Sequence, residues 1–590
     1  MIGGFTQQAT FNITVDYPKT YTALSNMPVT NRKNIKAHTM RANFQTTPAM
    51  HPYLIAIIVA DLDTLYTKKT YVPLWYKDLT RARQLHFALD VAETATIYLK
   101  DKYFQNDTLN DIPQTNYVAI PYYRDDGLSN WGIVFYSQKA ISYINEWNSI
   151  QRKTEVAALV ARKVANQFLN KITLSCWSDI WINEGIATFL GTHVVDKIFT
   201  DLRMMDLFVV RTRCESLHLE SVTNMPPVVF QINKSYDIKF SLFRYNKAFV
   251  LLRMLYHIIS DEVFRKSICN FLNNQVDHIG NIEELHSSNI ATILEMLHQC
   301  CCNLLCCMGN VFVESTSADN LWAVMQTALN ESNHTNRFNI KKIMDFWVTQ
   351  NQYPILKVTR NYRDGRTVIW AEMRNMSKRY EWWIPVTYTT ETNLNFNITP
   401  FFQEWITSEQ FFIHLPSINV NDWIIVNLQQ LGYYRVMYDK ENWLRLASYL
   451  NSNKYNKIHV VNRAQIIDDA YYFLIMKQLD FDMFKELTMY LSQETDYIAW
   501  YPMFNIFRNM LNHSNIFSHP EAASIKEHMR NIVYNLLEKI GYVNRVDDNI
   551  HMISLRDEAA EWACFFGDET CRKTAYKELQ NYMTLMTKHR

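Results

Sequence analysis

Two quantities are small in this chain: its glycine content and its net charge. Glycine accounts for 12 of 590 residues, roughly 2% where about 7% is usual. The 59 basic and 58 acidic residues leave a net charge of +1. A balance of this kind gives no electrostatic reason to expect nucleic acid or an anionic membrane as a partner.

A long uninterrupted apolar run is also absent. The nearest candidate, residues 296–313, is interrupted by histidine, glutamine and asparagine. A spanning helix needs about 18 to 20 apolar residues in succession, so no transmembrane segment is predicted. Residues 1–5 lack the basic n-region and the apolar h-region of a signal peptide, and none is predicted there.

Seven of the ten cysteines fall into two groups. Five lie within 300–307, mostly side by side, and this crowding lacks the C-x-x-C spacing of zinc sites, so an unselected insertion is favoured over metal binding or palmitoylation. Cys564 and Cys571 lie in an otherwise helical stretch and are spaced to close a small disulfide loop. Together with several N-x-S/T sequons, this pair favours a secretory origin and a glycoprotein. The sequons are at Asn12, Asn106, Asn233, Asn330, Asn333, Asn375, Asn397 and Asn512.

Apolar side chains make up 48% of the chain and aromatic ones 14%, enough for packed cores in roughly three to five domains. Alternating apolar residues predict a strand over 9–17, and the run 53–60 reads as a buried strand. Three- and four-residue steps predict an amphipathic helix over 84–104. Strand patterns return near Asp364-Gly365, a hairpin signal, and at 422–428 and 433–438. Beyond residue 440 the pattern is helical again.

These patterns predict an α+β multidomain protein with four parts. They are a partial N-terminal β domain (1–79), a mainly helical domain (80–352) with a cysteine-rich insertion at about 285–318, a small β-sandwich (353–439), and a C-terminal α-helical array (440–590).

The stretch 155–185 is the most informative. By itself it predicts a helix, a turn and a second helix, with Glu184 as the only carboxylate beside an aromatic-rich segment. Its end, W-S-D-I-W-I-N-E-G at 177–185, resembles the second half of the zinc site of the aminopeptidase N family of gluzincin metallopeptidases. In that family an H-E-x-x-H helix precedes the N-E-G glutamate. The resemblance implies that the mainly helical domain is thermolysin-like.

Counting back from Glu184 in the family frame places the two zinc-binding histidines at Ala161 and Ala165, and the general-base glutamate at Arg162. Two histidines at i and i+4 share a helix face and reach one zinc ion, while a third ligand leaves a position open for water. Zinc acidifies that water and the glutamate takes its proton. Because alanine has no donor atom, Glu184 is the only surviving ligand, and no metal cofactor is expected although the family uses zinc.

Two alternatives remain open for Arg162. Its guanidinium pairs with Glu184 across the vacated site, or it extends to solvent while Glu184 caps a helix or bonds to backbone. His193 is no replacement ligand, since nine residues turn an ideal helix by about 180° and point it away from Glu184.

Two further family motifs are altered. The segment Asp126-Gly-Leu-Ser-Asn130 resembles G-A-M-E-N, whose glutamate binds the substrate α-amine, so Ser129 and Asn130 are a vestigial substrate site. The segment 245–255 resembles the helix whose tyrosine stabilises the tetrahedral intermediate, and Tyr245 is retained as a vestigial catalytic residue. Glycines usual in these motifs have become Asp126, Leu169 and Ala248, which fits the low glycine content.

The resemblance covers nearly the whole chain outside the cysteine-rich insertion. It includes Phe44-Gln-Thr-Thr-Pro-Ala-Met50, the segment 432–438 and the segment 462–469. The family's N-terminal β domain and C-terminal helical array are longer, so we expect this chain to be a middle piece.

Three functions follow as hypotheses. The first is a catalytically inactive pseudopeptidase that binds a peptide or protein partner in a retained cleft. The second is an active zinc aminopeptidase, for which the scaffold argues and the motifs argue against. The third is a decayed or mis-assembled product. The family implies an extracellular or cell-surface location, and the sequence defines no oligomeric state.

Overall fold

The computed structural model describes residues 9–103, 114–145, 148–170, 179–223, 225–229, 241–280, 317–332, 338–373, 381–398, 404–512 and 522–588. These residues form two compact units. The first takes in the chain to residue 148, 152–200 and 226–349, and the second takes in 149–151, 201–225 and 350–590. The predicted four-domain division stays a prediction, and the cysteine-rich insertion lies almost entirely outside the described residues.

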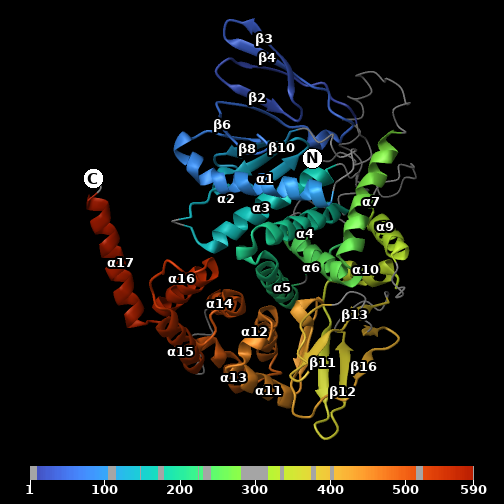
Figure 1. The fold of residues 1–590 in the computed structure, drawn as a ribbon, viewed down its shortest axis with the longest axis vertical. Helices are drawn as coiled ribbons and strands as arrows, with labels where there is room; N and C mark the ends of the chain where they lie inside the picture. Colours follow the sequence, from blue (N-terminus) through green and yellow to red (C-terminus); the bar gives the residue numbers. More distant parts are fainter. Residues whose placement is uncertain are drawn as a thin grey trace. The chain divides into compact units, whose positions relative to one another are not determined.

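The first unit begins with β-strands and continues into helices (Figure 1). Its elements are β1 (Thr14–Pro18), β2 (Thr22–Ser25), β3 (Val29–Lys36), β4 (Thr39–Phe44), β5 (Ile57–Ala60), β6 (Asp63–Tyr66), β7 (Pro73–Tyr76), α1 (His86–Lys102), β8 (Asn116–Ile120), β9 (Gly127–Asn130), β10 (Ile133–Ser137), α2 (Gln138–Ile141), α3 (Ile150–Leu169), α4 (Ile180–Ile198), α6 (Ser241–Ile259), α7 (Asp261–Gly280), α9 (Ala318–Glu331) and α10 (Ile340–Thr349).

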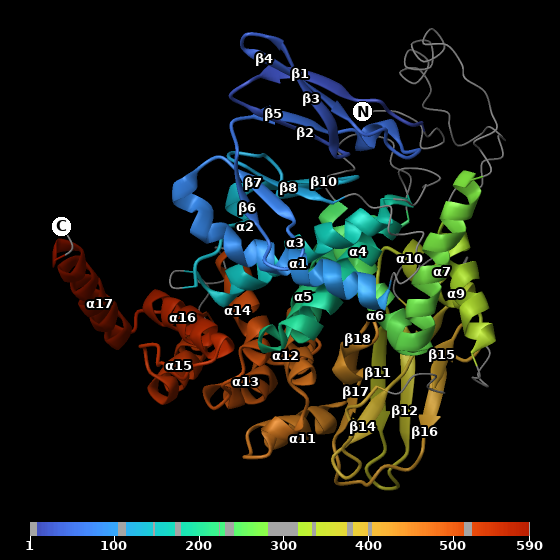
Figure 2. The same cartoon turned by 45° about the horizontal axis from the view of Figure 1, so that its top comes forward.

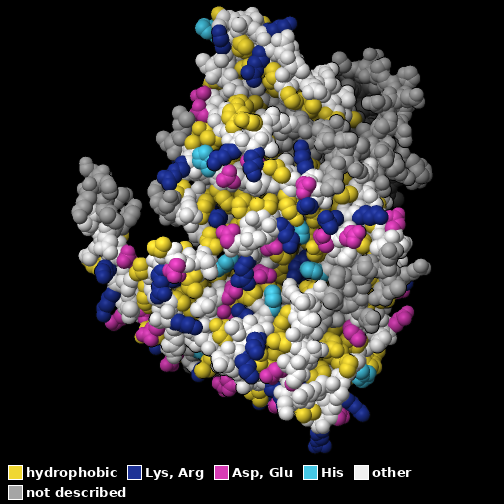
Figure 3. Space-filling model, viewed as in Figure 1, with side chains coloured by type: hydrophobic (Ala, Val, Ile, Leu, Met, Phe, Trp, Pro, Cys, Tyr) yellow, Lys and Arg dark blue, Asp and Glu magenta, His cyan; other side chains and the backbone are white. Residues whose placement is uncertain are grey.

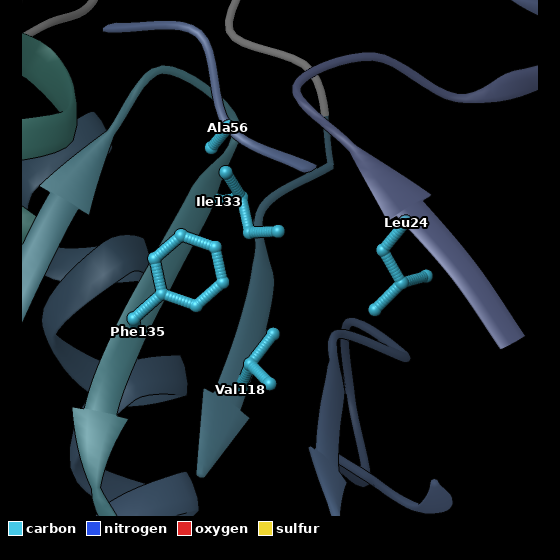
Figure 4. Packing of buried hydrophobic residues seen from close by; sticks show 5 residues of the cluster. All are labelled: Leu24, Ala56, Val118, Ile133 and Phe135. Carbon is cyan, nitrogen blue, oxygen red and sulfur yellow. The ribbon is translucent and has the colours of Figure 1, made fainter. Parts of the chain in front are cut away.

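A mixed sheet of strand order β6-β7-β8-β10-β9 lies between the N-terminal strands and the helices α1 and α3 (Figures 1 and 2). One sheet face packs towards β2, where Val118, Ile133 and Phe135 meet Leu24 and Ala56 (Figure 4). Strand side chains alternate between faces, so the neighbours of these residues point to the helices instead. β9 is the edge strand and pairs antiparallel with β10.

The second unit combines a β-sandwich with a helical array. Its elements are α5 (Met204–Val222), β11 (Ile355–Arg360), β12 (Thr367–Glu372), β13 (Trp383–Pro385), β14 (Tyr388–Thr390), β15 (Trp405–Thr407), β16 (Phe412–Leu415), β17 (Ile424–Val426), β18 (Arg435–Tyr438), α11 (Lys440–Leu450), α12 (Val460–Ile475), α13 (Phe481–Thr488), α14 (Tyr497–Asn512), α15 (Ala522–Ile540), α16 (Ile550–Phe565) and α17 (Glu569–Lys588).

Several sequence-based expectations are confirmed. The α+β character is as predicted, the helix predicted over 84–104 is α1, and the Asp364-Gly365 hairpin joins β11 to β12 with Gly365 at φ +78°. Cys564 and Cys571 form a disulfide with a Cα–Cα distance of 5.4 Å. The strand predicted over 9–17 is confirmed only in part, because β1 covers Thr14–Pro18; Tyr17 is buried, and Ile13 and Val15 are partly buried against the same cluster.

The buried strand predicted over 53–60 is wrong in length and burial. A short 3-10 turn occupies Pro52–Leu54, and only Ile57–Ala60 is a strand. Ile57 is 51% exposed because β5 pairs only with β2 in a two-stranded sheet and is not covered on both faces. An apolar run alone does not distinguish these two environments.

A buried ion cluster fixes the second unit. The Arg435 guanidinium donates to Asp468 at 2.7 Å and to Asp469 at 3.0 Å, and it lies over the ring of Tyr472. Arg213 lies within 3.9 Å of the Asp468 carboxylate and 3.8 Å of the Asp469 carboxylate. Two cations and two anions thus neutralise each other in the interior.

The visible surface mixes the two signs of charge without a large patch of either (Figure 3). This agrees with the near-zero net charge. Within the described ranges, no helix is both long enough and apolar enough to cross a membrane.

Candidate functional site

The helix pair predicted from residues 155–185 is present in the first unit as α3 and α4. Ala161 and Ala165 lie on α3 with no exposed surface. Glu184 lies in the second turn of α4 and is partly buried. The beginning of the N-E-G motif, Trp177 and Ser178, lies outside the described residues.

The two helices touch through their backbones. A Cβ atom on Gly191 of α4 would lie 2.6 Å from the Arg162 backbone nitrogen and 2.9 Å from the Ala161 carbonyl carbon. Such distances exclude any side chain at position 191 unless a helix moves. On the other side of α4, a Cβ on Gly185 would lie 2.9 Å from Ala248 of α6. The helices around Glu184 are therefore closely packed although the predicted metal ligands are missing.

Glu184 is held by an amide rather than by a cation. Asn166 Nδ2, one turn after Arg162 on α3, donates to Glu184 Oε1 at 3.1 Å. In the described chain Arg162 and Glu184 form no ion pair, so the pairing alternative is wrong. The second alternative, in which Glu184 caps a helix or bonds to backbone, is also wrong. Among the described residues the Glu184 carboxylate accepts a hydrogen bond from the side-chain amide of Asn166 and from no backbone group.

Arg162 itself is partly buried. Its Nε atom is enclosed and has no hydrogen-bond partner among the described residues. Among the described residues no carboxylate forms an ion pair with Arg162, which stands at the position that the sequence frame assigns to the general base.

Lys163 is a second cation at this place, and sequence reasoning missed it. The residue is 7% exposed. Burial lowers the pKa of its ammonium, while the negative charge of Glu184 and, less strongly, of Asp126 and Asp125 raises it. The signal in the sequence was an Arg-Lys pair inside the apolar part of this helix, between Val156-Ala-Ala-Leu-Val-Ala161 and Val164-Ala165.

The vestigial substrate segment is joined to α3. Ser129 Oγ accepts from Gln167 Nε2 at 2.6 Å and donates to the Lys163 carbonyl at 3.3 Å. Gln167 also donates to the Asn130 carbonyl at 2.7 Å and accepts from Gly132 N at 2.9 Å. Sequence reasoning did not find Gln167, which fastens the β9–β10 turn to the helix.

Asn130 makes a buried contact within the first unit. It is buried, and its Nδ2 donates to the Leu54 carbonyl at 3.1 Å. Tyr245 lies on α6, three residues before Ala248, so it belongs to the side of α6 that packs on Gly185 of α4. The structure thus brings the motif helices together, while the roles assigned to Ser129, Asn130 and Tyr245 stay predictions.

His193 lies away from Glu184 in an aromatic cluster. Its ring packs on Phe189 at 5.9 Å, Tyr256 at 5.7 Å and Tyr103 at 6.4 Å. Burial lowers the pKa of this imidazole to about 4. It is a neutral core histidine and contributes no ligand to the helix pair.

The buried imidazole predicts an acid-dependent loss of stability. In the unfolded chain His193 titrates near 6.5, so unfolding takes up a proton as the pH falls from about 6.5 to 4. The free energy of unfolding should drop over this window by up to about 3 kcal/mol through this group. His193→Phe should flatten that part of the pH profile in urea unfolding, and His38→Phe, at an exposed position, should leave it unchanged. An unaltered slope in His193→Phe would contradict the assignment.

The residues at the expected metal position do not fit zinc. Two methyl groups, one guanidinium and one carboxylate already bonded to an amide provide a single donor group, where zinc takes three or four. Among the described residues, no three His, Cys, Asp or Glu side chains are grouped so as to hold a metal ion.

Sequence comparisons agree with this architecture. The M1 metallopeptidases are the class of protein that this architecture indicates. Its features are the α3–α4 helix pair, the strand β9 beside it, the N-terminal strands and the C-terminal helical array. The family models named Peptidase M1 N-terminal domain, Peptidase family M1 domain and ERAP1-like C-terminal domain match residues 6–54, 87–298 and 423–589. The chain belongs to this M1 aminopeptidase family.

The similar curated proteins are distant in sequence. Aminopeptidase N of Plutella xylostella is 26% identical over 599 residues, covering 98% of this chain and 58% of the relative. Aminopeptidase Ey of Gallus gallus is 26% identical, covering 96% and 56%. Aminopeptidase N of Homo sapiens is 24% identical, covering 96% and 56%. The chain thus spans a little more than half the length of these relatives.

Proposed function

We propose that this chain is a catalytically inactive member of the M1 family, a pseudopeptidase that acts by binding a peptide or protein ligand. The observation that carries the proposal is the full burial of Ala161 and Ala165 at the two histidine positions, because neither methyl group donates to a metal. Arg162 adds a permanent positive charge where the enzymes have a base.

The side chains at this site support ligand binding rather than catalysis. A metal-free site has no activated water, and Ser129 presents no carboxylate to the α-amine of a substrate. Tyr245 has no oxyanion to stabilise without an activated nucleophile. What remains is a closely packed pair of helices that carries Arg162, Lys163 and Glu184.

We also propose that the chain folds in an oxidising compartment. The Cys564–Cys571 disulfide supports this, since such bonds persist outside the cytosol. A secreted or cell-surface location is consistent with this compartment and with the family.

Zinc content and peptidase activity test the proposal together. Purified protein, dialysed against trace zinc, should contain less than about 0.1 zinc per chain by mass spectrometry of the metal. It should not release p-nitroaniline from leucine p-nitroanilide above the rate of buffer. One zinc per chain combined with turnover that a chelator abolishes would establish the competing function, an active aminopeptidase.

A further inference from the structure

Arg162 differs from the other half-buried arginines because it has no carboxylate partner among the described residues. Arg152, on the same helix, pairs with Glu155 at 3.5 Å. Arg203 pairs with Asp206 at 3.1 Å and with Asp496 at 2.6 Å. Arg162 has no such carboxylate in the described part of the chain, and its enclosed Nε has no acceptor. The other partly buried arginines that the structure describes also have carboxylate partners, namely Arg211, Arg265, Arg445 and Arg508.

Two of the groups that interact electrostatically with Arg162 are the phenol of Tyr136 and the ammonium of Lys163. Tyr136 of β10 is on the sheet face that carries Ser129, whose hydroxyl contacts α3 at Lys163. The Tyr136 hydroxyl is enclosed and also lacks a partner among the described residues. Lys163 adds a second positive charge one residue further along the helix.

None of the three carboxylates near this part of α3 forms an ion pair with Arg162 in the described structure. The Glu184 carboxylate accepts from Asn166, and Asp125 and Asp126 are exposed on the turn before β9. The three charged side chains at the centre of the α3–α4 pair are two cations, Arg162 and Lys163, and one anion, Glu184. The buried part of the site therefore has an excess of positive charge.

We propose that Arg162, with Lys163 beside it, binds a carboxylate of a peptide ligand. The planar guanidinium presents paired N–H donors that match the two oxygens of a carboxylate. The positive excess repels a free α-amine, so the site prefers the opposite charge from the one the family recognises. This inference rests on the proposed function and names the chemistry of its ligand.

Three tripeptide probes distinguish the sources of the carboxylate. They are N-acetyl-Ala-Ala-Ala with a free C-terminus, the same peptide as its C-terminal amide, and N-acetyl-Ala-Glu-Ala amide. Titration calorimetry should show binding of one or both acidic peptides and about 10- to 100-fold weaker binding of the neutral amide. Binding of the first alone identifies a C-terminal carboxylate, and binding of the third alone identifies an acidic side chain. Equal affinity for all three, or no binding of either acid, overturns the proposal.

Variants locate the interaction. Arg162→Met should weaken the affinity for the acidic peptide by about 10-fold or more. Arg162→Lys should weaken this affinity less, because the charge remains. Arg152→Met, on the same helix but with its own ion pair, is the matched control and should bind as the wild type does. Unchanged binding in Arg162→Met would refute the site. Should that variant not fold by circular dichroism, the Arg162→Lys variant and the three-peptide comparison on wild-type protein decide the question.

The same protein sample separates this inference from the proposed function. Zinc content and hydrolysis are measured beside the titrations. If the protein is free of zinc, inactive and unable to bind either acidic peptide, only the proposed ligand class is disproved. A zinc-containing, active protein disproves the proposed function whatever its peptide preference.

Discussion

The triple variant Ala161→His, Arg162→Glu and Ala165→His is expected to bind one zinc ion per chain. The two imidazoles come from one face of α3, and Glu184 on α4 is the third ligand once it leaves the Asn166 amide. Close contact between the helices at Gly191 holds this frame in place. Metal analysis after dialysis against trace zinc measures the result.

The energies favour metal binding despite the crowded interior. Ala161 and Ala165 are fully buried, and each larger side chain costs about 1–3 kcal/mol of overpacking. Structural zinc sites bind with an apparent free energy of about 10–16 kcal/mol, which exceeds the cost of both histidines. The variant should therefore melt below the wild type in chelator and recover when zinc is added.

A fourth substitution provides the control. Adding Glu184→Gln to the triple variant removes the charge of the third ligand and should sharply weaken zinc binding. Zinc that remains bound in the quadruple variant would mean that the metal sits elsewhere. A folded triple variant without zinc would show that α3 and α4 no longer hold the geometry of the family site.

Arg435→Met is expected to destabilise the second unit by about 3–5 kcal/mol. The substitution keeps much of the side-chain volume but leaves Asp468 and Asp469 with only Arg213 for compensation. Two buried carboxylates against one cation leave an uncompensated charge in the interior. Urea unfolding followed by circular dichroism should show the shift in the transition of this unit.

Arg366→Met is the matched control in the same unit. Arg366 lies 3.5 Å from Asp364 with 82% of its side chain exposed, and such pairs contribute about 0–1 kcal/mol. A loss in Arg435→Met no larger than in the control would show that the buried cluster does not stabilise the unit.

Local patterns predicted the scaffold well. The steps along 84–104, the Asp364-Gly365 turn and the cysteine spacing of 564 and 571 each depend on residues close in sequence. A helix period, a positive φ and a short disulfide loop are properties of neighbouring residues, so one sequence reveals them. The strand predicted over 53–60 failed because its burial depends on which strands pair with it.

The contacts of the site were less accessible to sequence reasoning. Asn166 reaches Glu184 and Gln167 reaches the β9–β10 turn because α3 faces α4 on one side and the sheet on another. Neither polar side chain stands out in the sequence, since amides are common on helix surfaces. The family frame identified Arg162 and Glu184 but not the absence of a bond between them, which depends on how the side chains extend. Gly191 was missed as well, although a glycine in mid-helix in so glycine-poor a chain was a usable signal.

The contact at Gly191 also affects which substitutions the two helices tolerate. Because the two helices rest on each other through main-chain atoms, their spacing does not depend on the side chains at 161, 162 and 165. A substitution at any of these three positions is therefore expected to leave the main-chain contact between the helices in place. Under the proposed function, loss of catalysis by this route needs no rebuilding of the interior, and the triple variant tests whether three changes restore the metal site.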